Sequence, residues 1–109
     1  MEKFNSSESA EQVVDISNLA WTDFDNITQE QKESLEKDGW RLPSIQELYS
    51  AYLKKDTIEN WKKNDFYWSS SEFTDNDKDM WAIYFNTGYV SYYDKSHDFN
   101  IRYVKEIKK

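Results

Sequence analysis

Residues 81–93 read WAIYFNTGYVSYY, and this stretch decides which class of fold the chain adopts. Every second residue from Trp81 to Phe85 is large and apolar, which is the period of a half-buried β-strand. The Asn-Thr-Gly that follows, at 86–88, has the composition of a tight turn, and an aromatic run then begins at Tyr89. The stretch therefore predicts an antiparallel β-hairpin.

Two more strands are expected on either side of this hairpin. Residues 66–71 read FYWSSS, which predicts a strand that runs into a turn. Residues 94–98 read DKSHD, a turn that leads into a last strand over 99–107. Together with the hairpin, these segments predict an antiparallel sheet in the second half of the chain.

Two helices are expected before the sheet. Thr28 with Gln31, and Ser44 with Glu47, have the spacing of a capping box, which predicts helices over 29–38 and 45–54. The second helix is expected to be the better buried, because the first has only Leu35 as an apolar anchor. The fold class is therefore α+β, with two N-terminal helices packed on a twisted antiparallel sheet.

Length and composition favour a single domain. A chain of 109 residues is long enough for one hydrophobic core, and 17% of its residues are aromatic. Because each such ring buries roughly 150–250 Å², a compact core is expected in spite of the few aliphatic side chains. Residues 1–12 contain one aromatic residue, Phe4, and are expected to be a flexible acidic tail. One α+β domain is expected over 13–109.

The formal net charge is −7, and the excess lies in the N-terminal part. Residues 1–39 hold ten acids and three lysines, whereas acids and bases balance over 40–109. An acidic surface repels nucleic acid and attracts basic proteins. The charge therefore predicts a protein partner with a basic surface, and no direct binding to nucleic acid.

Eight acidic residues are candidates for contact with such a partner. Three lie on the first expected helix and five in loops of the sheet: Glu30, Glu33, Glu36, Asp75, Asp77, Asp79, Asp94 and Asp98. The alternating aspartates at 75–79 resemble the start of a calcium loop. Such a loop needs glycine at its sixth position and glutamate at its twelfth, where this chain has Met80 and Asn86. A solvated acidic turn is favoured, and neither a metal nor a cofactor is expected.

Groups with the chemistry of catalysis are scarce. The chain has no cysteine and a single histidine, His97, and the serine run at 69–71 lacks the glycines of a nucleophile elbow. Serines at a strand end more often bond to backbone groups. Two lysine pairs, at 54–55 and 62–63, flank Trp61 and could touch a nucleic-acid backbone, but a solvated helix end is favoured in so acidic a chain. The sequence therefore predicts a protein that is not an enzyme.

Arginine is rare in this lysine-rich chain. Arg41 and Arg102 are its only arginines, and each stands beside an aromatic residue. Guanidinium groups form bidentate pairs with carboxylates that lysine does not form. Both arginines are therefore expected to be structural pins, with Glu47 and Glu72 as candidate partners.

Four separated blocks resemble one bacterial family. They are WRLPS at 40–44 followed by Glu47, YWSSSE at 67–72, WAIYFNTG at 81–88 and IRYV at 101–104. In this order the blocks are similar to the family named for the C-terminal domain of the Legionella collagen-like protein, over residues 40–104.

That resemblance implies a fold related to C-type lectins and formylglycine-generating enzymes, with helices packed on a twisted antiparallel sheet. It implies structural roles for eight residues of the blocks: Trp40, Arg41, Pro43, Glu47, Trp68, Trp81, Gly88 and Arg102. The enzyme branch uses cysteines that this chain lacks, and the acid and amide triplets of calcium lectins are not evident. Many relatives are secreted and bind surface polysaccharides.

Two functions follow as expectations. The first is a small protein-binding module, for example an inhibitor carried by a phage or mobile element against a nucleic-acid-handling complex such as a CRISPR effector. The alternative is a carbohydrate-binding module of C-type-lectin-like fold, in which Trp and Tyr side chains would stack on sugar rings. Neither a signal peptide nor a run of about 18 apolar residues is evident. A cytoplasmic protein without membrane contact is therefore expected.

Overall fold

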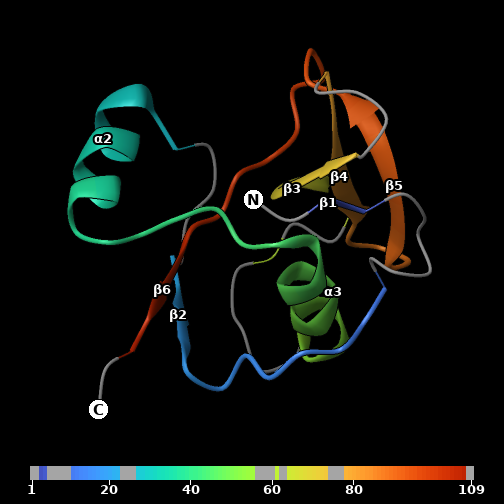
Figure 1. The fold of residues 1–109 in the computed structure, drawn as a ribbon, viewed down its shortest axis with the longest axis horizontal. Coiled ribbons are helices and arrows are strands. Elements are labelled where there is room, and N and C mark those ends of the chain that lie inside the picture. The colour runs from blue at the N-terminus through green and yellow to red at the C-terminus, as the bar shows by residue number, and fades with distance from the viewer. Residues whose placement is uncertain are drawn as a thin grey trace.

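Figure 1 shows the computed structural model of the chain, which describes residues 3–4, 11–22, 27–55, 61, 64–73 and 78–107. The strands within these residues are β1 (Lys3–Phe4), β2 (Leu19–Trp21), β3 (Phe66–Phe73), β4 (Asp79–Tyr84), β5 (Tyr89–Asp94) and β6 (Val104–Glu106). The helices are α2 (Gln29–Lys37) and α3 (Ile45–Leu53). The predicted α+β class is therefore confirmed.

The larger sheet has the strand order β1-β3-β4-β5. Strands β4 and β5 form the predicted hairpin, in which Tyr84 pairs with Tyr89 next to the turn. Strand β3 pairs antiparallel with β4 and continues through the three serines to Phe73, where the sequence predicted a turn. The register shifts between Trp68 and Glu72, and such a bulge lets a strand bend while its pairing continues.

Strand β1 makes the larger sheet mixed. It pairs parallel with the end of β3, with Lys3 opposite Glu72 and Phe4 opposite Phe73. The prediction of a purely antiparallel sheet is therefore wrong at this edge. A strand of two residues carries too little pattern to be read from sequence, and it falls in the segment predicted as a tail, of which residues 1–2 and 5–10 lie outside the described part.

Both predicted helices are present, and both capping boxes are confirmed. The side chain of Thr28 accepts a hydrogen bond from the N–H of Gln31, and that of Ser44 accepts one from the N–H of Glu47. In each box the side chain at the third helical position accepts from the N–H of the cap residue. The helices are not N-terminal as predicted, because β1 and β2 precede them.

Helix α3 packs against the larger sheet. Its residues Ile45, Leu48 and Ala51 are buried in one cluster with residues of β3 and β4. By contrast, none of the nine residues of α2 is buried, and Figure 1 shows α2 at the left, apart from the sheet. The prediction that both helices pack on the sheet is not confirmed, because a helix with Leu35 as its one apolar anchor has no apolar face to bury.

The smaller sheet pairs β2 antiparallel with β6. Arg41 extends it beyond β6, since Arg41 and Val104 exchange two backbone hydrogen bonds of 2.8 Å. The sequence predicted one strand over 99–107, but only Val104–Glu106 is a strand. Before it, Asn100 forms a bridge with Tyr67 of the larger sheet. One segment of chain thus connects both sheets.

Aromatic rings form much of the core between α3 and the larger sheet. Trp61 stacks on Phe85 with a centroid distance of 4.2 Å and meets Tyr67 edge-on at 5.0 Å. Ring pairs in these arrangements contribute about 0.5–1.5 kcal/mol beyond the burial of their area. The aromatic residues therefore supply the core that the few aliphatic residues could not.

Neither of the two helices that the structure describes is long and apolar enough to cross a lipid bilayer.

Candidate functional site

Helix α2 presents three of the predicted contact residues to solvent. Glu30, Glu33 and Glu36 are all exposed, and the helix stands apart from the larger sheet in Figure 1. Because no residue of α2 is buried, these carboxylates take no part in the core. The geometry leaves the three side chains accessible to a partner.

Two lysines lie among these glutamates on α2. Lys37 lies four residues after Glu33, and Glu36 lies four residues after Lys32, which is the spacing at which opposite charges on a helix attract each other. The surface of α2 is therefore less acidic than its three glutamates alone suggest.

The other predicted contact residues lie away from α2. Asp79 and Asp94 are opposite each other in the register of β4 and β5, and Asp98 is exposed after β5. Figure 1 shows β4 and β5 at the right and α2 at the left. Asp75 and Asp77 lie outside the described residues. The described members of the predicted set therefore form two groups and not one surface.

The carboxyl group of Asp94 is held in its charged form by its own turn. A hydrogen bond of 2.8 Å from the N–H of Ser96 to Oδ1 lowers the pKa of Asp94 most, and the charge of Lys78 lowers it further. In the part of the chain that the structure describes, no three acidic, histidine or cysteine side chains are placed to hold a metal ion. The chemistry at this end of the sheet is that of a negatively charged turn.

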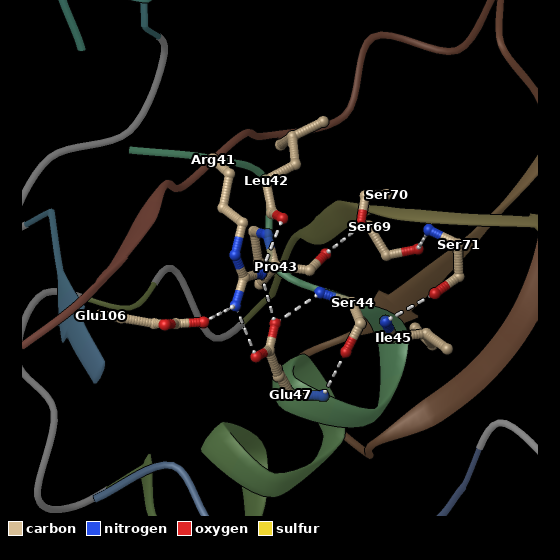
Figure 2. A network of polar contacts seen from close by, with 10 residues as sticks. All are labelled: Arg41, Leu42, Pro43, Ser44, Ile45, Glu47, Ser69, Ser70, Ser71 and Glu106. Carbon is tan, nitrogen blue, oxygen red and sulfur yellow. Dashed lines mark hydrogen bonds and ion pairs between the residues drawn. The ribbon is translucent and has the colours of Figure 1, made fainter. Parts of the chain in front are cut away.

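Figure 2 shows the polar network around Arg41. Its guanidinium binds Glu47 in a bidentate pair, with Nη1 to Oε1 at 2.8 Å and Nη2 to Oε2 at 2.9 Å. Glu106 of β6 lies 3.8 Å from Nη2, and Glu47 also accepts a 2.8 Å hydrogen bond from the N–H of Ser44. The carboxylate of Glu47 thus caps α3 and, through Arg41, connects this helix to the smaller sheet.

The serine run of β3 bonds to backbone groups. Ser69 Oγ donates to the C=O of Trp81 at 2.6 Å, and Ser71 Oγ accepts from the N–H of Ile45 at 3.0 Å. Both serines are fully buried. The Ser71 contact joins β3 to the start of α3, as Figure 2 shows, and the Ser69 contact joins β3 to β4, so both serines have a structural role.

We expect Glu47→Gln to lower the free energy of unfolding by about 1–2 kcal/mol at pH 7, because it weakens a cap and a charged pair. Burial by itself raises the pKa of Glu47, but the hydrogen bonds from Arg41 and Ser44 outweigh it, so that the pKa lies below its usual value. A carboxyl group with a lowered pKa stabilises the fold above the pKa of the unfolded chain. This contribution is lost as the pH falls through the folded-state pKa.

Urea unfolding at pH 7 and at pH 3 measures this effect. The wild type should lose more stability between the two pH values than Glu47→Gln does. The control is Glu33→Gln, an exposed glutamate whose replacement should change stability by less than about 0.5 kcal/mol. An equal loss in the wild type and in Glu47→Gln would show that Glu47 does not carry this pH dependence.

Arg102 and Trp61 lie in the core. Arg102 is 1% exposed, and its Cζ lies 4.2 Å from the centre of the Trp61 ring. Trp61 is itself 8% exposed, which leaves no open ring face for a nucleobase. Of the two lysine pairs beside it, the pair at 62–63 lies outside the described residues, and Lys55 Nζ sits 4.5 Å from the ring centre of Tyr52. The nucleic-acid contact that the sequence suggested around Trp61 therefore has no accessible aromatic ring.

Aromatic rings also gather on the face of the larger sheet opposite α3. Four of them stack in one row, which we call the aromatic column: Tyr84, Phe66, Phe99 and His97, in that order. Successive centroids are 4.8, 4.7 and 5.1 Å apart, with interplanar angles of 26°, 15° and 13°. Tyr93 meets Phe99 edge-on at 5.4 Å, and Trp68 is tilted by 41° against Phe99.

The alternation of side chains along β3 and β4 places Phe66 and Tyr84 on the face of the sheet opposite α3. Phe66 and Tyr84 alternate along their strands with Tyr67 and Ile83, which are buried against α3. Phe99 reaches the column because the neighbouring Asn100 bridges to β3. The sequence predicted the strand alternation but not this bridge, and for that reason the column was missed.

The column leaves its rings partly exposed. Tyr84, Phe66 and Phe99 are half-buried, and His97 is exposed. Phe66 and Phe99 each stack on two other rings, so that both of their faces are covered. His97 stacks on Phe99 alone and ends the row.

A cavity of about 810 Å³ lies between the end of α2 and the smaller sheet. Its lining residues are Ala20, Asp38, Gly39, Arg41, Lys105, Glu106 and Ile107. The size is that of a small-molecule site. However, its two carboxylates and two cations balance, and the guanidinium of Arg41 already binds Glu47. The cavity therefore favours no single class of ligand.

Comparison with known families gives a match that covers most of the chain. The family model described as the Lcl C-terminal domain matches residues 5–105, nearly the whole chain. The match therefore extends well beyond the four blocks at 40–104. No curated protein matches the chain.

Proposed function

Since the chain belongs to the Lcl C-terminal domain family, we propose that it works as a non-enzymatic binding module whose partner is a protein with a basic surface. Membership of a family transfers fold better than function. The proposal therefore rests on the exposed acidic helix α2 and on the charge of the chain, and not on the family alone.

The observation that carries the proposal is that α2 holds three exposed glutamates and buries none of its residues. A helix of nine residues gains little stability by itself, and most helices in proteins are stabilised by packing of an apolar face. Helix α2 has little such packing, and recognition explains its glutamates better than a role in the fold does. The net charge of −7 would steer a basic partner toward the molecule.

The environment of the nucleophile candidates supports a role other than catalysis. Ser69 and Ser71 are buried and bonded to backbone groups. The imidazole of His97 stacks on Phe99 at the surface, on the face of the sheet opposite α3. We therefore propose no reaction and no cofactor for this chain.

Replacing Glu30, Glu33 and Glu36 together by Gln is expected to slow association with the basic partner about tenfold at low salt, because steering raises association rates by 10-fold or more. The three side chains are exposed, so the free energy of unfolding should change by less than about 1 kcal/mol. A pull-down from the host lysate at low salt supplies the partner, and surface plasmon resonance measures its association rate constant.

The matched control lies on the same helix. Replacing Lys32 and Lys37 by Gln makes α2 more acidic and should speed association, a change of opposite sign at nearly the same place. Both effects should shrink in 1 M salt, where the Debye length is about 3 Å. Association that is the same for all three proteins at low salt would remove α2 from the contact and contradict the proposal.

A carbohydrate-binding module is the second candidate, and the aromatic column favours it. Sugars stack on exposed ring faces, and the column and its neighbours Trp68 and Tyr93 lie partly exposed on one face of the sheet. Two facts weigh against it: Phe66 and Phe99 have both faces covered by other rings, and Trp61 and Trp81 are buried. The protein partner is therefore preferred.

Three finer features belong to the same proposal. A C-type-lectin-like fold rests on the family resemblance, and a cytoplasmic location rests on the sequence pattern. We further propose that the module is an inhibitor of a nucleic-acid-handling complex, such as a CRISPR effector, because such a complex would offer the basic surface that a small acidic protein binds. The proposal includes no direct contact with nucleic acid or with a membrane.

A further inference from the structure

The aromatic column ends in an exposed ring that its neighbours hold in place. His97 stacks on Phe99 with an interplanar angle of 13°, and Tyr93 meets it edge-on at 5.8 Å. Trp68 anchors the backbone beneath it, because its Nε1–H donates to the C=O of His97 at 3.2 Å. His97 nevertheless remains exposed. A ligand group can therefore reach an aromatic ring whose position is already set.

Carboxylates stand beside this end of the column. Asp98 directly follows His97, and the C=O of Asp94 accepts a 3.2 Å hydrogen bond from the N–H of His97, which keeps the turn compact. Both aspartates are exposed. Over the described residues between 64 and 100, five carboxylates stand against two lysines, so this part of the chain also carries a net negative charge.

We infer that the His97 end of the aromatic column is a docking site for an arginine side chain in a surface segment of the basic protein partner. The inference rests on the proposed function, because it needs a basic partner. It adds a second contact, on the face of the sheet opposite α3, that the acidic helix α2 does not provide.

Arginine fits this site better than lysine does. A guanidinium group is planar and weakly hydrated, so it stacks on an aromatic ring and still presents N–H donors at its edge. Stacked on His97, it would lie at the same turn as Asp94 and Asp98, whose exposed carboxylates attract its positive charge. A lysine ammonium is a hydrated point charge with no plane to stack, and would respond to the charges alone.

The test uses nona-arginine and nona-lysine peptides as probes of the ¹⁵N-labelled full chain at low salt. We expect nona-arginine to shift the indole signal of Trp68 and the amide signals of 93–99, and to bind about threefold or more tighter than nona-lysine. A Trp68→Phe variant assigns the indole signal.

Three variants sharpen the test. His97→Ala should weaken binding of nona-arginine about 2–5-fold, the range of a surface cation–π contact, and should leave nona-lysine nearly unaffected. Asp98→Asn should weaken both peptides and keeps the ring, so it does not depend on how well His97→Ala folds. Leu53→Ala is the control, because Leu53 is 51% exposed on α3, away from the column, and its loss should change neither affinity.

Three results would overturn the inference. Shifts confined to α2, with equal affinity for the two peptides, would leave the basic partner of the proposed function standing but remove the arginine site. An absence of shifts with both peptides would contradict the arginine site and the attraction to basic partners together. Shifts of the column residues by a neutral hexasaccharide, and not by nona-arginine, would assign this face to carbohydrate.

Discussion

Replacing Gly88 by alanine is expected to lower the free energy of unfolding by about 3–5 kcal/mol. Gly88 has a φ of +77°, a region that costs an alanine about 1–2 kcal/mol. A Cβ atom at this position would also collide with the ring of Tyr52, 2.8 Å from Cδ2 and 2.9 Å from Cζ. Forcing extra atoms into a packed site costs a further 1–3 kcal/mol or so. The turn between β4 and β5 therefore needs glycine for two separate reasons.

Gly39 offers a matched control, since its φ is +90° but an added Cβ would meet only Lys105 Cε, at the ordinary contact distance of 3.7 Å. Gly39→Ala should therefore cost about 1–2 kcal/mol, the backbone part alone. Chemical denaturation of both variants gives the comparison. Equal losses would show that the close approach to Tyr52 contributes nothing. Tyr52→Leu in the Gly88→Ala background should recover part of the loss, because it removes the ring that the Cβ meets.

Arg102→Lys is expected to destabilise the fold by about 2–4 kcal/mol although it keeps the charge. Arg102 is 1% exposed and lies over Trp61, which in turn stacks on Phe85 in the core. Lysine cannot reproduce the planar stacking, and a buried charged group that loses its contacts costs about 1–3 kcal/mol or more. The substitution should therefore loosen the aromatic core around Trp61.

The comparison for Arg102 is Lys95→Ala, which truncates an exposed lysine side chain in a turn. It should change the free energy of unfolding by less than about 0.5 kcal/mol. The measurement is the chemical denaturation midpoint of each variant, compared under the same conditions. If the two substitutions lower the midpoint equally, Arg102 acts only as a charge and its stacking on Trp61 contributes nothing to stability.

The elements predicted well from sequence are those set by neighbours along the chain. The capping boxes at Thr28 and Ser44 depend on residues three positions apart, and both helices were therefore placed to within one residue at each end. The hairpin of β4 and β5 depends on strand alternation around a turn that contains Gly88. Local hydrogen bonds and backbone preferences decide such features, and a single sequence displays them.

Pairings between distant segments were not predictable in the same way. Strand β1 has two residues, and its parallel pairing with β3 leaves no periodic pattern. The last segment divides between two sheets, through Asn100 on β3 and Val104 beside Arg41, although its composition reads as one strand. These pairings depend on how the core packs, and residue propensities along the chain do not predict them.

The candidate surfaces likewise combine features that the local sequence predicts with features that depend on contacts between distant segments. The exposure of Glu30, Glu33 and Glu36 could be expected from a helix with one apolar anchor. The distance of α2 from β4 and β5 could not, because it depends on how the chain between them is routed. The aromatic column needs His97 and Phe99 to fold back over β3, a contact that spans about thirty residues of sequence.

The most direct test of a basic protein partner is the salt dependence of its association with the wild-type chain. The Debye length falls from about 30 Å at 0.01 M to about 3 Å at 1 M ionic strength. For a partner steered by the net charge of −7, the association rate constant should fall by about tenfold or more over this range, while dissociation changes less. An association rate constant that stays the same from 0.01 M to 1 M would contradict a basic protein partner and would favour the carbohydrate-binding module instead.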